Sequence, residues 1–353
     1  MRYRLILGLL IGALALLLAL WGVPLAALGE ALGRARIGWL LPVAGLFFVQ
    51  QLLRSARQAL LLHGAAGPGY PISLRQSLSV LCVSFLFINT LPARIGEVVR
   101  PTLLWERHRV PLGRGVAMVF FERAVDLASA IGMLALVAFF IPTSARSVSV
   151  GGRALDLVEL GTTAATVVLP LVLGGLIGVM LGASALSRLL GPRVGRLPVW
   201  ARRPASLLSR FSAGFAEGLA PVRSPGRLLA VLGLTGLTWA LSGLMFVCSA
   251  HAFHADDLIG YGQGVGLLSI TMLGTVVPSA PGFAGTYEAF LRGGLALFGV
   301  AGPARDADAL AFALVHHWWV YGVQATTAIY FLTVDQVSPR ALWRRAMESW
   351  RSP

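Results

Sequence analysis

The chain of 353 residues is 56% hydrophobic and only 12% charged, whereas a soluble domain usually carries about 25% charged residues. Several apolar runs are long enough to be candidate bilayer spans. Composition therefore excludes an ordinary soluble domain and predicts an all-α polytopic membrane protein that forms a single integral membrane domain over residues 1–353.

The net charge of +14 comes from 29 basic residues, all of them arginine. They cluster in a few loops, a pattern typical of membrane orientation rather than of nucleic-acid binding. Cys82 and Cys248 both lie in apolar runs, and their spacing indicates neither a metal site nor a disulfide framework. We therefore expect membrane lipids as partners, and no nucleic acid, metal ion or cofactor.

Six apolar segments are long enough to cross a hydrocarbon core of about 30 Å. In chain order they are Leu5–Leu20, Ile37–Leu62, Gly115–Ile141, Leu160–Leu181, Leu228–Phe253 and Ala309–Val334. The first has the basic front of a signal peptide, but we interpret it as a span whose N-terminus lies inside. Two further segments differ from the six. Leu78–Leu91 is too short to cross unaided, and Tyr261–Val300 is interrupted by Pro278, Pro281, Gly282 and Gly285.

Loop charge predicts how the two odd segments lie. We count the N-terminus, the loops 54–114 and 182–227 and the tail after 334 as inside. If only the six segments cross, these parts hold 22 arginines and the outside loops five, which is a strong positive-inside asymmetry. A single crossing by either odd segment would exchange the sides of all later loops. We therefore predict that Leu78–Leu91 is re-entrant from the cytoplasm and Tyr261–Val300 from outside, with both termini cytoplasmic.

Opposed re-entrant segments are typical of inverted-repeat transporters, whose sites lie near the bilayer midplane. The two segments share a short pattern of a proline, three residues and a glycine, followed by a glutamate. It comprises Pro92, Gly96 and Glu97 in the first segment and Pro281, Gly285 and Glu288 in the second. The pattern is consistent with an inverted repeat.

The first motif, NTLPARIGEVVR, carries charges at the depth of the apolar segments. Irregular backbone there must line a polar cavity or be buried in protein, and a broken helix offers free N–H groups to an anion. Arg94 and Arg100 match the oxygens of a phosphate, and Glu97 would hold an arginine or take part in proton coupling. Alternatively, both arginines are positive-inside anchors at a loop edge.

The third span contains Glu122, Arg123 and Asp126, and intramembrane charges usually face the bundle interior. They form part of the cavity wall, or else an ion-pair network that braces this span through Arg94 or Arg100. Arg123 and Asp126 are close enough in sequence to pair with each other.

In the second motif, Glu288 and Arg292 have the i, i+4 spacing of a helical pair, although Glu288 also suits a helix N-terminal cap. His316 and His317 could couple transport to protons, but we favour hydrogen-bonded structural histidines. Asp306-Ala307-Asp308 has the D-x-D form of glycosyltransferases, in a loop too small for a catalytic domain.

The segment 182–227 is the largest polar insertion, and 335–353 forms a cytoplasmic tail. Apolar side chains recur at helical spacing opposite Arg210 and Glu217; they are Leu207, Leu208, Phe211, Phe215 and Leu219. This predicts either an amphipathic helix against anionic headgroups or an ordinary solvated helix. The basic segment is also a candidate docking site for a soluble or membrane partner.

Three motifs in this order resemble the lysylphosphatidylglycerol synthase transmembrane-region family of flippase-like proteins. They are NTLPARIGEVVR at 89–100, FERAVD at 121–126 and PSAPGFAGTYEA at 278–289. The resemblance implies a lipid-translocating membrane domain. It points to Asn89, Pro92, Arg94, Gly96, Glu97, Arg100, Glu122, Arg123, Asp126, Pro281, Gly282, Gly285 and Glu288 as the site. Because the sequence ends at Pro353, we expect no soluble aminoacyl-transferase domain.

The sequence thus favours a flippase-like protein of a bacterial-type inner membrane that moves an anionic or phosphate-bearing lipid, either a phospholipid or a polyprenyl-linked lipid. Two other hypotheses stay open. One is an intramembrane enzyme that acts on lipid-linked substrates with a carboxylate base. The other is a non-transporting subunit that docks a soluble partner through 182–227. The sequence does not decide the oligomeric state.

Overall fold

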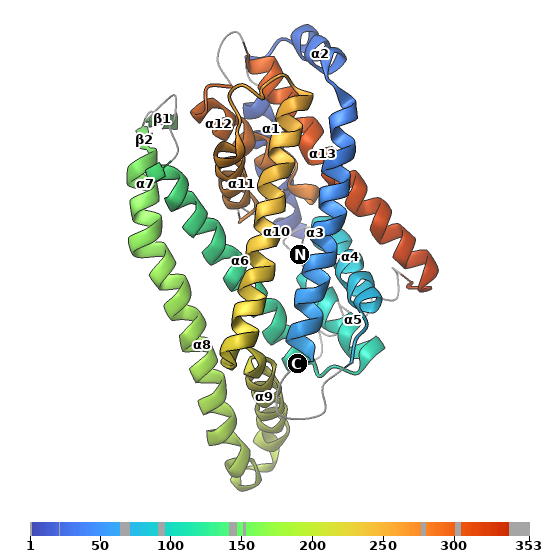
Figure 1. The fold of residues 1–353 in the computed structure, drawn as a ribbon. Coiled ribbons are helices and arrows are strands. Elements are labelled where there is room, and N and C mark those ends of the chain that lie inside the picture. The colour runs from blue at the N-terminus through green and yellow to red at the C-terminus, as the bar shows by residue number, and fades with distance from the viewer. Residues whose placement is uncertain are drawn as a thin grey trace.

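The computed structural model describes residues 2–20, 22–63, 71–90, 96–140, 147–150, 153–276, 280–300 and 305–338. This part of the chain is helical apart from one short β-hairpin (Figure 1). The helices are α1 (Arg2–Leu20), α2 (Leu25–Arg34), α3 (Leu40–Leu62), α4 (Leu74–Thr90), α5 (Val99–His108), α6 (Leu112–Phe140), α7 (Leu157–Thr163), α8 (Leu169–Leu190), α9 (Val199–Gly218), α10 (Pro225–Ala252), α11 (Tyr261–Val276), α12 (Thr286–Leu297) and α13 (Asp306–Val334). Short 3₁₀ turns at Ile37–Trp39, Gly191–Arg196, Ala220–Arg223 and Pro281–Phe283, and a π-helical turn at Ala164–Val168, adjoin them.

The helices confirm the predicted all-α class, and one short β-hairpin is added to it. β1 (Ser147–Val150) pairs antiparallel with β2 (Arg153–Asp156), and Ser147 lies opposite Asp156. β1 alternates polar and apolar residues, and Gly151-Gly152 follows it directly in the sequence, which is a hairpin signal. The hairpin lies at the end of the molecule where α6 ends and α7 begins (Figure 1).

Four helical stretches of the described chain are long and apolar enough to cross a membrane. They are Ile37–Leu62, Leu112–Phe140, Gly161–Arg196 and Pro225–Ala252. Each overlaps a predicted span, although the third continues well beyond the predicted end at Leu181 because the helix does not stop before Leu190. α1 and α13 also form as helices over their predicted segments, but they are not among the four, so a total of six spans stays a prediction.

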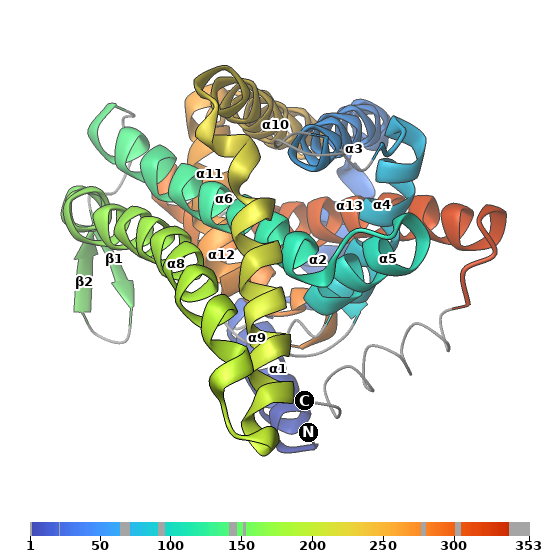
Figure 2. The ribbon, with the colours of Figure 1, turned by 90° about the horizontal axis from the view of Figure 1, so that it is seen from below.

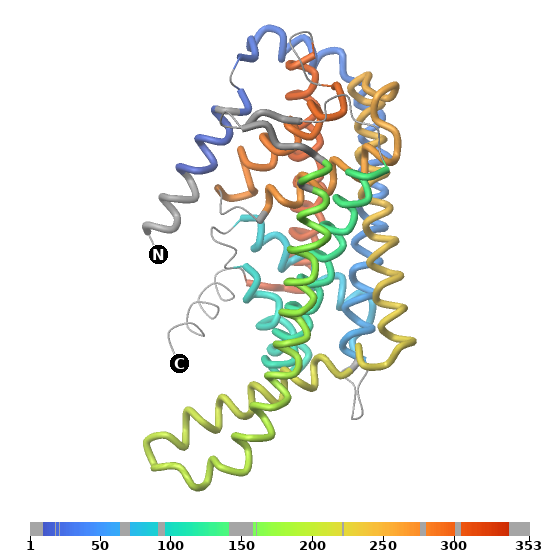
Figure 3. Tube along the Cα trace, turned by 90° about the vertical axis from the view of Figure 1, so that its left-hand side faces the viewer, coloured from blue at the N-terminus to red at the C-terminus, as the bar shows by residue number. Residues whose placement is uncertain are grey.

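The first odd segment, Leu78–Leu91, coincides with α4 and is followed by α5, whereas the second, Tyr261–Val300, contains α11 and α12. α4 and α5 flank the first break, and α11 and α12 flank the second. The two pairs occupy opposite halves of the molecule along the direction of the long helices (Figures 1 and 3). Pro92 and Arg94 of the first break and Pro278 of the second lie outside the described residues.

Two apolar cores correspond to these halves. One packs around α4 and α5 and the other around α11 and α12. On α6, Val125 belongs to the first core and Ala130 to the second; on α10, Val231 and Trp239 divide in the same way. Asp126 and Thr235 lie between these positions, so a polar layer separates the two cores.

Around this layer, α3 and α10 pack side by side along one edge of the molecule (Figure 2). α8 and α9 form a hairpin that extends beyond the ends of α3 and α10 (Figure 3). α9 is the helix predicted within 182–227. Phe215 on this helix and Leu219 directly after it are buried, whereas Leu207, Leu208 and Phe211 are exposed. At the tip of the hairpin, Val199 and Trp200 are 79% and 82% exposed.

Candidate functional site

A polar stripe on α3 supplies one wall of the polar layer. Within an otherwise apolar helix, polar residues recur at the spacing of a single helical face; they are Gln50, Gln51, Arg54, Ser55, Arg57 and Gln58. Five of these side chains are buried, and Arg54 is half-buried. Arg54 and Arg57, which we had counted among the arginines of an inside loop, lie within α3, because this helix continues to Leu62.

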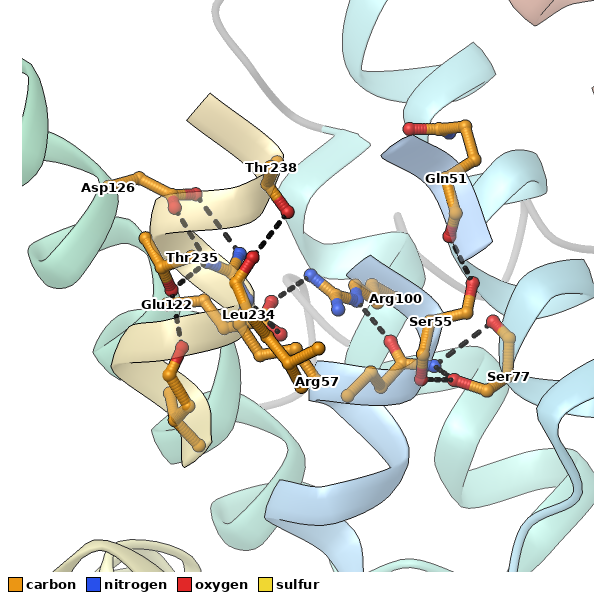
Figure 4. A network of polar contacts seen from close by, with 12 residues as sticks. Gln51, Ser55, Arg57, Ser77, Arg100, Glu122, Asp126, Leu234, Thr235 and Thr238 are labelled. Carbon is orange, nitrogen blue, oxygen red and sulfur yellow. Dashed lines mark hydrogen bonds and ion pairs between the residues drawn. The ribbon is translucent and has the colours of Figure 1, made fainter. Parts of the chain in front are cut away.

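Arg57 is the centre of a buried ion-pair network (Figure 4). Its guanidinium contacts the two oxygens of Asp126 at 2.8 and 3.3 Å and donates to the hydroxyl of Thr235 at 2.9 Å. Its Nε lies 3.6 Å from Glu122 Oε1. A buried charge is tolerated when it is paired and hydrogen-bonded in this way, so Arg57 ties α3 to α6 and α10.

Arg100 extends the network to α5. Its Nη1 lies 2.5 Å from Glu122 Oε2, and its Nε donates to Gln58 Oε1 at 2.6 Å. The amide of Gln58 in turn donates to the hydroxyl of Ser77 on α4 at 2.8 Å. The sequence left two hypotheses for Glu122: part of the cavity wall, or part of an ion-pair network. The contacts favour the network, which links α6 to α5 and, through Gln58, to α4.

Glu97 and Arg123 form a more accessible pair at the edge of this network. Arg123 Nε lies 3.7 Å from Glu97 Oε1, and the two side chains are 35% and 23% exposed. The predicted pairing of Arg123 with Asp126 is corrected, because Asp126 contacts Arg57 instead. Arg123 also lies over the ring of Phe85, with its Cζ 5.5 Å from the ring centroid.

Gly96 holds the first break against α4. A Cβ at this position would lie 2.2 Å from Ile88 N and 2.3 Å from Phe87 C. Such contacts with backbone atoms are closer than any side chain permits, so a glycine is required there. This close approach places Glu97, the next residue, beside the polar layer.

The second motif folds as a turn followed by α12. Pro281 and Gly282 lie in the 3₁₀ turn, and Gly285 has φ +86°, a conformation that favours glycine. The carboxylate of Glu288 accepts a hydrogen bond from the Gly285 N–H at 2.7 Å, which confirms Glu288 as the helix cap.

The main contacts of Glu288 and Arg292 are with other helices and not, as the i, i+4 spacing had predicted, with each other. Glu288 Oε1 lies 2.8 Å from His317 Nδ1, whereas Arg292 contacts Asp306 at 3.2 Å and donates to the carbonyl of Ala19 at 2.6 Å. Both side chains therefore contact α13, at His317 and at Asp306, and Arg292 also contacts α1. Several predicted site residues that the structure describes line neither of the cavities described below, namely Gly96, Arg100, Glu122, Pro281, Gly282, Gly285, Glu288 and Arg292.

The two histidines of α13 have different environments. His316 is buried, lies 2.7 Å from the hydroxyl of Ser249 through Nδ1 and stacks on Phe246. His317 pairs with Glu288 and stacks on Tyr287, with ring centroids 4.1 Å apart. Both histidines are thus hydrogen-bonded. Asp306 and Asp308 of the D-x-D sequence contact Arg292 and Arg34, as structural ion pairs do.

An inner cavity of about 210 Å³ brings both motifs together. The first motif contributes Asn89 and Glu97, α6 contributes Arg123 and Asp126, and α13 contributes His316 and His317. From the second motif, Phe283 and Tyr287 complete the wall. Two residues missed by the sequence analysis, Arg54 and Phe85, also line this cavity.

A larger outer pocket of about 870 Å³ adjoins the inner cavity. The two share Glu97, Arg123, Asp126, Trp239, Met272 and Thr275. Beyond these residues the outer pocket is lined by α5, α6, α9 and α11 with mostly apolar side chains. Leu112 and Phe211 on its wall are 39% and 43% exposed, so the pocket reaches the surface. The outer pocket is therefore mainly apolar, and the residues that it shares with the inner cavity include the charged Glu97, Arg123 and Asp126.

Comparison with known proteins identifies the family of the chain. The profile of the family described as "Lysylphosphatidylglycerol synthase TM region" matches residues 5–328. The chain is 24% identical over 335 residues to the "Glycosyltransferase AglD" of Haloferax volcanii, covering 90% of this chain and 52% of the relative. The chain thus spans about half the length of that curated relative. No solved structure matches the chain. The protein is a multi-pass membrane protein that belongs to the lysylphosphatidylglycerol synthase transmembrane-region family.

Proposed function

We propose that the protein moves an anionic, phosphate-bearing lipid between the leaflets of the membrane through the inner cavity. The observation that carries the proposal is the continuity of an apolar pocket of about 870 Å³ with a charged cavity of about 210 Å³. An amphiphile has the same division, since its tails favour an apolar space and its headgroup a polar one. The family and the archaeal relative support a membrane protein that acts on lipids or lipid-linked molecules.

In this proposal the α4–α5 and α11–α12 pairs are re-entrant from opposite faces, and six other segments cross the membrane. Their location in opposite halves of the molecule supports this topology (Figure 1). The polar layer between the two apolar cores then lies near the bilayer midplane, where transporters with inverted repeats hold their substrates.

The α8–α9 hairpin would lie at the cytoplasmic face of a bacterial-type inner membrane. Eight of the arginines fall within 182–227, against one acidic residue, Glu217. A basic segment with exposed Val199 and Trp200 suits a leaflet rich in anionic lipids. A soluble or membrane partner is an alternative occupant of this segment. In that case loss of 182–227 would abolish function, whereas substitutions in the cavity would not.

An intramembrane enzyme is the second candidate, favoured by the name of the archaeal relative. Glu97, Glu122 and Asp126 are the carboxylates of the polar layer that could serve as its general base. Each of these carboxylates contacts an arginine in the structure, an arrangement typical of structural ion pairs. For this reason we rank translocation above catalysis.

Reconstitution into vesicles separates the two functions. A fluorescent phosphatidylglycerol is placed in both leaflets, and an impermeant reductant bleaches the outer leaflet. Translocation predicts that vesicles with protein lose the fluorescence of the inner leaflet, whereas protein-free vesicles retain it. Equal retention in both samples, repeated with a fluorescent polyprenyl phosphate, would contradict the proposal. A new lipid product without exchange would establish the enzyme instead.

A further inference from the structure

Arg54 differs from the other arginines of the polar layer in its contacts. Arg57, Arg100 and Arg123 each lie within 4 Å of a carboxylate. Among the described residues, Arg54 has no carboxylate at such a distance. Its Nε is buried without a hydrogen-bond partner, as are those of Arg57 and Arg123. Arg54 therefore brings a positive charge into the protein interior that no described side chain neutralises by direct contact.

The charges of the layer give the same result when counted together. Four arginines, namely Arg54 and the three above, face three carboxylates: Glu97, Glu122 and Asp126. Within this set one positive charge is in excess; Glu288, a further buried carboxylate, contacts His317 of the cavity wall instead. An uncompensated charge in a poorly solvated interior is costly, and an anionic ligand would remove that cost.

Arg54 also lies at a cavity, where a ligand-binding group is expected. Its side chain lines the inner cavity together with Phe85 and Arg123. The Cζ atoms of Arg54 and Arg123 lie 5.4 and 5.5 Å from the centroid of the same Phe85 ring. Two guanidinium groups thus contact one aromatic ring at the wall of one cavity. Arg100, by contrast, is held behind the cavity wall by Glu122 and Gln58.

We propose that Arg54 and Arg123 bind the phosphate of the transported lipid in the inner cavity, while its tails occupy the outer pocket. Planar guanidinium groups match the oxygens of a phosphate and form charge-assisted hydrogen bonds with them. Phe85 fixes the two cations by stacking. This inference rests on the proposed function and assigns the headgroup site within it. It replaces the sequence-based assignment of the phosphate to Arg94 and Arg100.

Binding of a simple amphiphile tests the assignment directly. Purified protein in a neutral maltoside detergent is titrated with dodecyl phosphate, with dodecylphosphocholine and with inorganic phosphate. We expect saturable binding of dodecyl phosphate, weakened about tenfold or more by Arg54→Gln, since charge-assisted hydrogen bonds are lost. Arg54→Lys should retain part of the affinity. Arg203→Gln, which removes an exposed arginine of α9, should bind like wild type.

Three results would overturn the inference. The first is equal affinity of wild type and Arg54→Gln for dodecyl phosphate, which would leave Arg54 without a role in binding. The second is displacement of dodecyl phosphate by inorganic phosphate at similar concentrations, which would identify free phosphate as the ligand. The third is equal binding of dodecylphosphocholine, which would show that the site does not select an anion.

Thermal unfolding distinguishes a ligand-binding arginine from a structural one. Without ligand, Arg54→Gln removes an unpaired cation and should leave the melting temperature unchanged or raised. Arg57→Gln leaves Asp126 and Glu122 without their partner and should lower it clearly. If Arg54→Gln lowered it as much as Arg57→Gln, Arg54 would be structural. Should wild type bind dodecyl phosphate through Arg54 but exchange no lipid between leaflets, the headgroup site would stand and translocation would fail.

Discussion

Arg100 of α5 and Glu122 of α6 form an ion pair of 2.5 Å between their Nη1 and Oε2 atoms, and each side chain is only 1% exposed. Removing one member of such a pair leaves the other charged and buried, which costs about 3–5 kcal/mol. We expect Arg100→Gln to lower the free energy of unfolding by about this amount, measured by denaturation in detergent.

A conservative exchange and a double variant serve as the controls for this pair. Arg100→Lys should restore little, because lysine cannot contact Glu122 and Gln58 at once as Arg100 does. Arg100→Gln combined with Glu122→Gln should be more stable than the sum of the single effects predicts. Wild-type stability of Arg100→Gln would show that the pair contributes nothing.

Gly96 is required by the close approach of its chain to α4. In Gly96→Ala the new Cβ would collide with the backbone at Phe87 and Ile88, so the break and α4 must separate. We predict a strong loss of melting temperature and of lipid exchange. Gly132→Ala is the matched control, since nothing lies within 4 Å of a Cβ there and alanine favours the helix by about 1 kcal/mol. Equal behaviour of the two variants would refute the packing argument.

Asp335, just after α13, contacts residues of α4 and α5. Its carboxyl should make the stability of the folded protein depend on pH. Burial alone raises the pKa of this carboxyl, but hydrogen bonds from Ser79 and Arg75 outweigh it and lower the pKa. A lowered pKa means stabilisation that is present above the unfolded value of about 3.9 and lost as pH falls through the folded value. Arg107 also donates to its backbone carbonyl.

The comparison of wild type with Asp335→Asn measures this contribution. Wild type should be the more stable protein at pH 7, and the difference in melting temperature should shrink as the pH falls below about 4. A difference that does not change with pH would assign the role of Asp335 to its backbone contact alone.

Labelling of single cysteines tests the proposed topology. In a variant without Cys82 and Cys248, cysteines replace four exposed residues, namely Leu74, Trp105, Leu25 and Tyr261. An impermeant maleimide should label positions 74 and 105 from the cytoplasmic face only, because the α4–α5 pair re-enters there. Positions 25 and 261 should react from the opposite face only. Labelling of 74 and 105 from different faces would mean that the α4–α5 pair crosses the membrane.

The sequence predicted most helices, because long apolar runs and prolines fix where helices can form and break. It also singled out Glu122, Asp126 and Glu97, since charges in such runs are costly and rarely incidental. It missed Arg57, the centre of the network, although the polar residues of α3 recur with helical spacing. Periodicity shows that this face is polar. It does not show that α6 and α10, far away in sequence, supply the partners of Arg57.

Partner choice was also the weak point in the second motif. Spacing predicted a contact of Glu288 with Arg292, whereas the fold brings His317 to Glu288 and Asp306 to Arg292. Each of these partners belongs to α13, whose packing against α12 depends on the whole bundle. Local spacing identifies which residues can pair within a helix, and tertiary packing decides which of them do.

The most direct measurement of lipid movement through the cavity compares leaflet exchange in two tryptophan variants of α6. Val116→Trp places a large side chain in the outer pocket, whereas Leu136→Trp adds the same group at a position that is 58% exposed and outside both cavities. In vesicles of equal protein content, Val116→Trp should slow the exchange of fluorescent phosphatidylglycerol at least about tenfold, the effect of about 1.4 kcal/mol on a barrier, and Leu136→Trp should exchange at the wild-type rate. Equal rates for Val116→Trp and wild type, with both proteins folded, would contradict passage through this pocket.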